Sequence, residues 1–371
     1  MTVLLFYGLK MKIGIISFSI SNTSGAGRFA VNLSRGMRKI GMNVSLYTYH
    51  IDRDLSGYLS SEGISCFFYK TSLNFIDNYR MISDSRKVLS CISKLINLDQ
   101  FCDVYIVLSD KMIGTSQFKN NNVWVYISQG DMLFLFFNRA FTSLHFPFSS
   151  IFSLQLSKRF AKHQIFSKKY DLILGNSNFT SELMSFFYDT SVEGVVYPPV
   201  DTERFRPIRN EASEGKYVLV LLRSTAESNF KLVERLAQTI NVHVVGEVQI
   251  KGAMNLGKIK DEDLIKEYSN ALFTLNPNLQ EYFGYSIAES LACGTPVLAF
   301  NHGGARDQII DGFNGWLSTS EENLMEKARN IYDTGYDPSM RYNARESSYN
   351  FTIDTTVNKL TTYLATLGLK S

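Results

Sequence analysis

Short apolar segments alternate with segments of helical periodicity along most of this 371-residue chain. In the first half, the apolar run 13–18 precedes a helical pattern over 25–40, which Gly41 ends, and a second apolar run follows at 44–47. Such runs are typical of buried strands, and their alternation with helices favours parallel β-α-β units. The sequence therefore predicts an α/β fold with doubly wound sheets. The other runs that we expect to be strands are 104–108, 123–127, 172–174, 217–222, 242–245, 272–275 and 296–299.

The length and the prolines indicate two domains. A chain of this length exceeds the usual size of one domain, and three of its seven prolines lie between 198 and 207. The formal charge also changes sign there, from +7 over residues 1–200 to −4 over 201–371, which favours domains with different ligands. We predict Rossmann-like domains over 1–200 and 201–345, followed by a helical segment over 346–371.

The composition excludes several classes of protein. Hydrophobic residues make up 45% and charged residues 20%, which is ordinary for a globular protein and excludes disorder and collagen-like repeats. The four cysteines form no C-x-x-C pair, so we expect no zinc ribbon, no disulfide framework and a reducing compartment. There is no run of 18 apolar residues, and residues 1–10 are too short for a secretion signal. We therefore expect a cytoplasmic chain without a transmembrane helix, in which residues 1–10 are either an extra strand or an artefact of the start site.

We expect no metal requirement. The histidines show no ligand spacing. The literal D-x-D sequence 52–54 lies beyond the second predicted strand, where a metal role is not expected. The acidic run 261–263 fits the start of a helix, where acidic side chains are favourable, with Asp261 as the N-cap of a helix over 262–270.

Two glutamates flank the start of a predicted helix in the second half. Gly284 can open this helix after the strand 272–275, and the free N–H groups of a helix N-terminus form an anion site. Glu281 precedes that terminus and Glu289 lies inside the helix, so the two carboxylates could bracket a phosphate and accept hydrogen bonds from sugar hydroxyls. The alternative is a solvated helix with two ordinary glutamates.

A longer ordered pattern surrounds this pair and resembles a known family. The E-x7-E spacing of Glu281 and Glu289 is that of retaining GT-B glycosyltransferases, and the surroundings are similar to family 4, which transfers sugars from nucleotide donors. The resemblance covers about 12–365. It implies two domains that face a central cleft, an N-terminal one for the acceptor and a C-terminal one for the donor, and a last helix that crosses back to the first. The stretches that carry it are 25–28, 176–180, 197–207, 278–284, 288–297, 303–307 and 311–315.

The resemblance also implies roles for single residues. Glu289 would hold the donor ribose and Glu281 would contact the transferring sugar, while the amides of Gly284 and Tyr285 face the diphosphate or the sugar. Arg223 matches the arginine that neutralises the diphosphate, where a fixed cation stabilises the charge that builds on departure. The donor is expected to be a UDP- or GDP-sugar, with no further cofactor. The remaining donor-site candidates are Gly25, Gly27, Ser228, Phe283 and Ser286.

The sequence departs from the family at two positions. Ser228 stands where the family usually has a lysine, so one cation at the diphosphate is missing or comes from elsewhere. After the strand 123–127, Ser128 or Gln129 stands where many relatives have a histidine. We expect Gln129 to position the sugar and Asp131 to orient the acceptor hydroxyl or assist its deprotonation; the alternative for Asp131 is a helix cap.

Two further features of the first half suggest ligands. The loop at Gly25 and Gly27 is close to a dinucleotide fingerprint, but no acidic residue ends the second strand, which disfavours a dehydrogenase. The segment 132–170 contains six basic and ten aromatic side chains and no acidic one. This composition favours binding to an anionic membrane surface, such as the inner face of the membrane, over binding to nucleic acid. The alternative is that the segment forms a core helix with an exposed basic face.

The sequence thus predicts a retaining glycosyltransferase that moves a sugar from a nucleotide-diphosphate sugar to a glycan or to a polyprenol- or other lipid-linked acceptor. Two alternatives remain open. One is a sugar-nucleotide-binding pseudoenzyme, which the missing lysine and histidine suggest. The other is a GT-B-shaped epimerase or phosphorylase.

Overall fold

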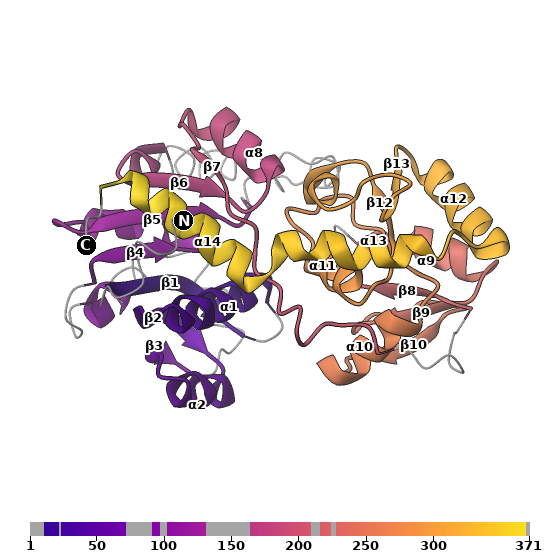
Figure 1. The fold of residues 1–371 in the computed structure, drawn as a ribbon, viewed down its shortest axis with the longest axis horizontal. Coiled ribbons are helices and arrows are strands. Elements are labelled where there is room, and N and C mark those ends of the chain that lie inside the picture. The colour runs from indigo at the N-terminus through magenta and orange to yellow at the C-terminus, as the bar shows by residue number, and fades with distance from the viewer. Residues whose placement is uncertain are drawn as a thin grey trace, which may run out of the picture. The chain divides into compact units, whose positions relative to one another are not determined.

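The computed structural model describes residues 11–21, 24–71, 91–96, 102–130, 164–208, 216–223 and 228–368, without the side chains of residues 110 and 111. The chain divides into two compact units. The first comprises residues 1–199 and 353–371, and the second comprises residues 200–352. The chain therefore enters the second unit once and then returns to the first (Figure 1).

A parallel sheet forms the centre of the first unit. Its strand order is β3-β2-β1-β4-β5-β6-β7, so β1 lies inside the sheet, and the chain builds one edge from it and then crosses to build the other, as doubly wound sheets do. The strands are β1 (Lys12–Ile20), β2 (Asn43–Ile51), β3 (Ser65–Lys70), β4 (Val104–Val107), β5 (Val123–Ser128), β6 (Leu172–Gly175) and β7 (Gly194–Val195). The helices described over their full length are α1 (Gly25–Lys39), α2 (Arg53–Ser61), the 3-10 helix η2 (Asp110–Phe118), α8 (Asn178–Tyr188) and α14 (Ile353–Thr366).

Helix α14 completes the core on one face of this sheet. Leu360 and Leu364 of α14 are fully buried in the same cluster as Leu33 of α1. Gly36 allows the two helices to approach, because a Cβ there would lie 2.5 Å from Ile353 Cγ2. Figure 1 shows α14 beside α1. The last helix of the chain is therefore part of the first core.

Aromatic side chains cover the opposite face. Tyr47 of β2 and Trp124 of β5 lie on either side of Tyr105 of β4, with ring centroids 6.0 and 4.7 Å from it. All three are fully buried. Gly14 of β1 makes room for them, since a Cβ there would lie 2.6 Å from the Tyr105 ring. Alternation of side chains along each strand separates these rings from the aliphatic face.

The second unit is built on the same plan. Its parallel sheet has the order β10-β9-β8-β11-β12-β13. Leu232 and Leu236 of α9 and Leu324 of α12 are fully buried against one face, and Ile287 and Leu291 of α11 are buried with residues of β12 in a second cluster. The strands are β8 (Val218–Leu221), β9 (Val242–Val245), β10 (Met254–Gly257), β11 (Phe273–Asn276), β12 (Val297–Phe300) and β13 (Gly315–Ser318). The helices are α9 (Phe230–Ala237), α10 (Asp261–Asn270), α11 (Tyr285–Ala292), η4 (Gly303–Asp307), α12 (Glu321–Thr334), α13 (Ser339–Ser348) and η5 (Tyr349–Phe351).

The architecture confirms the predicted fold class. Each apolar run predicted to be a strand is a strand, and two doubly wound parallel sheets are present. The sequence did not predict β3, β7, β10 and β13, which are the four edge strands. The predicted cap of α10 is wrong by one residue, since Lys260 is the N-cap and Asp261 already lies in the helix.

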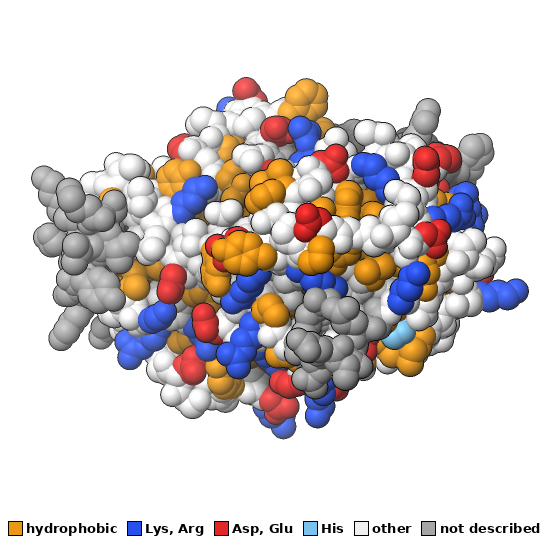
Figure 2. Space-filling view, turned by 45° about the vertical axis from the view of Figure 1, so that its right-hand side comes forward, with side chains coloured by type: hydrophobic (Ala, Val, Ile, Leu, Met, Phe, Trp, Pro, Cys, Tyr) orange, Lys and Arg blue, Asp and Glu red, His pale blue; other side chains and the backbone are white. Residues whose placement is uncertain are grey.

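Within the described ranges of the chain, no helix is long and apolar enough to cross a membrane. On the face drawn in Figure 2, Lys and Arg side chains lie interspersed with Asp and Glu side chains. The opposite net charges of the two halves of the sequence therefore do not appear on this face as separate positive and negative fields.

Candidate functional site

The N-terminus of α11 follows the carboxyl end of a central strand, β11, in the second unit. Gly284 is the N-cap of α11 and has a φ of 93°, in the left-handed region that favours glycine. A Cβ at this position would also lie 2.9 Å from Glu281 Cγ and from Ile287 Cδ1. Glycine therefore lets the chain turn sharply from the loop at Glu281 into the helix.

Glu281 is fixed by two asparagine amides. Asn278 Nδ2 donates to Glu281 Oε2 at 2.9 Å, and Asn276 Nδ2 lies 3.3 Å from the same oxygen. The backbone N–H of Asn278 in turn donates to Asn276 Oδ1 at 3.0 Å. Because Asn276 is the last residue of β11 and only 4% exposed, it links the sheet to this partly exposed carboxylate.

Glu289 lies on α11 and is only 3% exposed. The Tyr268 hydroxyl, from α10, donates to Glu289 Oε2 at 3.3 Å. The carboxylate also affects the neighbouring Cys293. Burial of this thiol raises its pKa, and the negative charge of Glu289 raises that pKa further. A buried carboxylate needs hydrogen-bond donors, and the Tyr268 hydroxyl is one of them.

Gly303 and Gly304, in η4, brace the loop before α11 from behind. The N–H of Gly304 donates to Glu281 O at 2.7 Å. A Cβ on Gly303 would lie 2.3 Å from that same carbonyl oxygen, and one on Gly304 would lie 2.4 Å from Tyr282 O. The backbone of η4 thus packs directly against the backbone of the loop, which only glycine permits.

Gln308 and Asn314 hold the same loop through hydrogen bonds. The Gln308 side chain donates to the carbonyls of Phe283 and Gly284, and Asn314 Nδ2 donates to Gln308 O at 2.9 Å. Both residues are at most 2% exposed. From the sequence we predicted no role for Gln308, Asn314 or Asn276. The one signal available was the position of Asn276 at the carboxyl end of a predicted strand.

The other donor-site candidates lie around this loop in different ways. Arg223 is exposed just beyond β8, which neighbours β11 in the sheet. Ser228 is 7% exposed, and its Oγ lies 3.5 Å from Asn278 Oδ1, so it touches the residue that holds Glu281. The ring of Phe283 is buried against Tyr285 and Phe351, so its side chain is not exposed to a ligand.

Ser286 also belongs to this group of contacts. Its Oγ lies 3.4 Å from Asn276 Nδ2, the amide that also reaches Glu281. The structure therefore gathers Glu281, Ser228 and Ser286 around one pair of asparagines.

The candidate residues of the first unit follow the carboxyl ends of two strands of its sheet, β1 and β5. Gly27 is buried in the first turn of α1, which follows β1. Its N–H donates to Ser24 Oγ, the N-cap oxygen of α1, at 3.0 Å. A Cβ on Gly27 would lie 2.5 Å from that same oxygen. Gly25 is the first residue of α1. At the end of β5, Ser128 is buried and Gln129 lies half-buried with its amide 3.4 Å from Ile127 O. Asp131 and residues 132–163 lie outside the described residues.

Part of the chain is similar in sequence to known proteins. Residues 201–350 match the family model of glycosyl transferases group 1. A GDP-Man:Man(3)GlcNAc(2)-PP-Dol alpha-1,2-mannosyltransferase of Caenorhabditis elegans is 24% identical over 201 residues, which cover 43% of this chain and 43% of that protein. The chain thus spans less than half the length of this relative.

Solved structures share the fold over nearly the whole chain. A sucrose-phosphate synthase from Thermosynechococcus elongatus superimposes with a TM-score of 0.77 at 15% identity, over 96% of this chain and 99% of that one. Anabaena HepE, solved in complex with UDP and glucose, superimposes with a TM-score of 0.70 at 15% identity, over 96% and 100%. Residues 201–350 therefore match the glycosyl transferases group 1 family, within a chain whose two units have the GT-B fold of glycosyltransferases.

Proposed function

We propose that this protein transfers a sugar from a nucleotide-diphosphate sugar to a glycan or lipid-linked acceptor, with retention of the anomeric configuration. The observation that carries the proposal is the pair of carboxylates at α11. Glu289 is buried inside the helix and bonded to Tyr268, while Glu281 stands at its N-terminus, held by Asn276 and Asn278.

Each residue would act on a different part of the donor. The first N–H groups of α11 and the positive end of its dipole suit the diphosphate. Arg223, exposed beyond the neighbouring strand β8, supplies a cation for the same group. Glu289 would accept hydrogen bonds from the ribose, and Glu281 would hold a hydroxyl of the transferring sugar. HepE was solved with UDP and the C. elegans relative is named for GDP-Man, so both bases belong in a binding test.

Retention without a protein nucleophile suits this residue set. The bond between the anomeric carbon and the phosphate oxygen breaks, and the acceptor oxygen bonds to the same face of that carbon. The departing phosphate takes the acceptor proton, so the reaction balances without a general base. Arg223 and the α11 amides would stabilise the charge that develops on the leaving diphosphate.

Nucleotide binding and product stereochemistry test the proposal. Calorimetry with UDP, GDP, ADP and their sugars should identify one tight ligand, and NMR of the product should show the anomeric configuration of the donor. Glu289→Gln should weaken the binding of that ligand. Glu326→Gln, at an exposed position of α12, should leave its affinity unchanged. Inversion at the anomeric carbon would refute the retaining mechanism, and no binding by any nucleotide would refute the donor site.

A second candidate function is nucleotide-sugar binding without transfer, which the serine at position 228 favours. Ser228 is nearly buried beside Asn278 and provides no charge for the diphosphate. If this candidate is correct, purified protein binds the donor but neither transfers nor hydrolyses it. Turnover of the donor in either reaction would exclude it.

Membrane association is a separate proposal for a lipid-linked acceptor. Its basis is the basic and aromatic composition of 132–170, of which only 164–170 lies within the described residues. Flotation with anionic vesicles should retain the protein and added salt should release part of it. Equal behaviour with neutral and anionic vesicles would contradict the proposal.

A further inference from the structure

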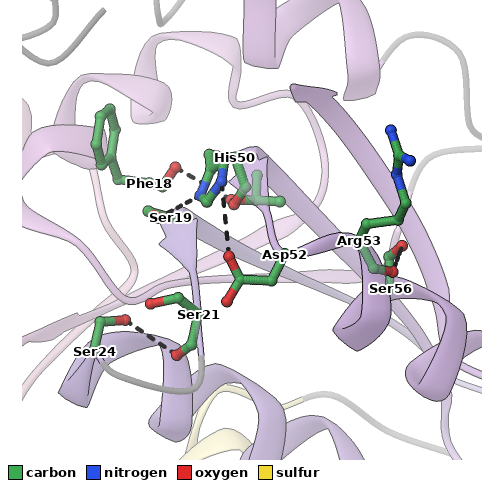
Figure 3. Close-up of polar contacts among 9 residues, drawn as sticks. Phe18, Ser19, Ser21, Ser24, His50, Asp52, Arg53 and Ser56 are labelled. Atoms are coloured by element: carbon green, nitrogen blue, oxygen red, sulfur yellow. Dashed lines mark hydrogen bonds and ion pairs between the residues drawn. The ribbon is translucent and has the colours of Figure 1, made fainter. Parts of the chain in front are cut away.

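Three polar side chains meet at the carboxyl ends of β1 and β2 in the first unit. Ser19 and His50 are partners across the two strands, and Ser19 Oγ lies 2.9 Å from His50 Nδ1. On the other side of the ring, Asp52 Oδ1 lies 3.8 Å from His50 Nε2. Figure 3 shows the imidazole between the serine and the carboxylate.

The imidazole is held and the carboxylate is accessible. His50 is 8% exposed and is bonded through Nδ1, so its ring has a fixed orientation. The Asp52 side chain is 45% exposed. Although Asp52 is the N-cap of α2, its side chain makes no capping bond to that helix. Within the part of the chain that the structure describes, the carboxylate is therefore directed towards His50 rather than used by its own helix.

The separation of His50 and Asp52 suits one intervening oxygen atom. In the tautomer in which Ser19 donates to Nδ1, the proton of the ring is on Nε2, the ring nitrogen that lies nearer to Asp52. At 3.8 Å the two groups are too far apart for a direct hydrogen bond, yet a single oxygen can lie about 2.8 Å from both. That oxygen must accept from Nε2–H and donate to the carboxylate. A hydroxyl group does both, and so does the water molecule that such a hydroxyl would displace, whereas a carbonyl, carboxylate or phosphate oxygen only accepts.

The local charge points to a neutral ligand. Asp52 repels an anionic group, and Figure 3 shows the guanidinium of Arg53 pointing away from His50. We propose that His50 and Asp52 form a binding site for a hydroxyl of a neutral sugar or polyol, and that Ser19 positions the imidazole. The site lies at the carboxyl ends of the strands, where ligands of doubly wound folds bind. As the acceptor subsite, it rests on the proposed transferase function and specifies that function further, because it selects a hydroxyl-rich acceptor over a phosphorylated one at this position.

Binding of simple glycosides tests the site. The probes are the methyl α-glycosides of glucose, galactose and mannose together with myo-inositol, measured by saturation-transfer NMR on the full chain. At least one probe should bind, and Asp52→Ala and His50→Phe should each weaken it by tenfold or more. Asp52→Asn, which keeps an acceptor oxygen, should recover part of the binding. Asp54→Ala, which removes the exposed neighbouring acid on α2, should have no effect.

Further measurements separate this proposal from the donor site. UDP or GDP binding should be the same in the wild type and all four variants, which also shows that they are folded. With an active donor, Asp52→Ala should raise the acceptor KM and leave donor hydrolysis unchanged. Absence of binding by every probe, or equal binding in Asp52→Ala, His50→Phe and the wild type, would overturn the hydroxyl site. Absence of nucleotide binding in the wild type would instead contradict the proposed function.

Discussion

The phenol of Tyr268 donates a hydrogen bond to Glu289 Oε2 across 3.3 Å, and neither residue is more than 3% exposed. One oxygen of the carboxylate is therefore anchored from α10, which fixes the direction of the group. Tyr268→Phe should weaken nucleotide binding by about 0.5–1.5 kcal/mol, the usual contribution of one hydrogen bond. Calorimetry measures this, and unchanged affinity would show that the anchor does not orient Glu289 for a ligand.

Removal of the carboxylate itself should have a larger effect. Glu289→Ala should weaken nucleotide binding by about 1–3 kcal/mol, because hydrogen bonds from the ribose to a charged acceptor are lost. The control compares the affinities of the variant and the wild type for the free base and for the nucleoside. The variant should lose affinity for the nucleoside but none for the base alone, and equal affinity of variant and wild type for the nucleoside would contradict the ribose assignment.

Arg223 should affect turnover more than binding. Its proposed partner is the charge that develops on the leaving diphosphate, so Arg223→Ala should lower kcat about 10²-fold or more and change nucleoside affinity little. Arg223→Lys should retain part of the activity, since it keeps a charge but not the two-pronged geometry. Steady-state kinetics with a saturating donor distinguishes the two effects. A variant with wild-type kcat would exclude Arg223 from the reaction.

Gly304 tests the contact between η4 and the loop before α11. Gly304→Ala places a Cβ within 2.6 Å of Tyr282 O and Phe283 Cα, so it should displace the loop, lower Tm and weaken nucleotide binding together. Gly57→Ala is the control, because a Cβ there meets nothing within 4 Å. On a helix interior this second change should stabilise by up to about 1 kcal/mol. Thermal unfolding with and without nucleotide compares the two, and a Gly304→Ala variant with normal affinity would contradict the bracing role.

His302 should make stability depend on pH. Burial lowers the pKa of His302 below its usual value, while its ring stacks on Phe300 at 5.7 Å. The unfolded chain then binds a proton at higher pH than the folded one, so the free energy of unfolding falls as the pH falls below about 7. His302→Gln should reduce this loss. Urea unfolding at pH 7.5 and 5.5 measures it, and parallel losses in variant and wild type would assign the effect to other groups.

The sequence predicts the central strands well and the edges poorly, for a physical reason. β4 and β5 are buried on both faces and contain continuous apolar runs. β10 is an edge strand with exposed or half-buried residues, and its sequence carries no such run. β3, an edge strand of the other sheet, does contain the apolar run 66–69, yet its residues are all exposed or half-buried. Hydrophobic patterning detects burial, and an edge strand is identified mainly by the neighbour to which it bonds.

The site shows the same limit. The spacing of Glu281 and Glu289 is local and can be recognised in the sequence, as can the glycine between them. The partners that fix these carboxylates are not local: Tyr268 lies 21 residues before Glu289, on another helix. His50 appeared in the sequence only as the end of a strand without an acidic residue, because its pairing with Ser19 depends on the register of two strands.

Completion of the first core by α14 has a consequence for synthesis on the ribosome. Leu360 and Leu364 belong to that core, yet they are translated only after the whole second unit. At roughly 5–20 residues per second this delay is on the order of ten seconds, during which the α1 surface that receives α14 lacks its cover. Limited proteolysis of nascent chains stalled at residue 352 should find the second unit protected and the first still susceptible. The half of the protein that is made first would then be the half that finishes folding last.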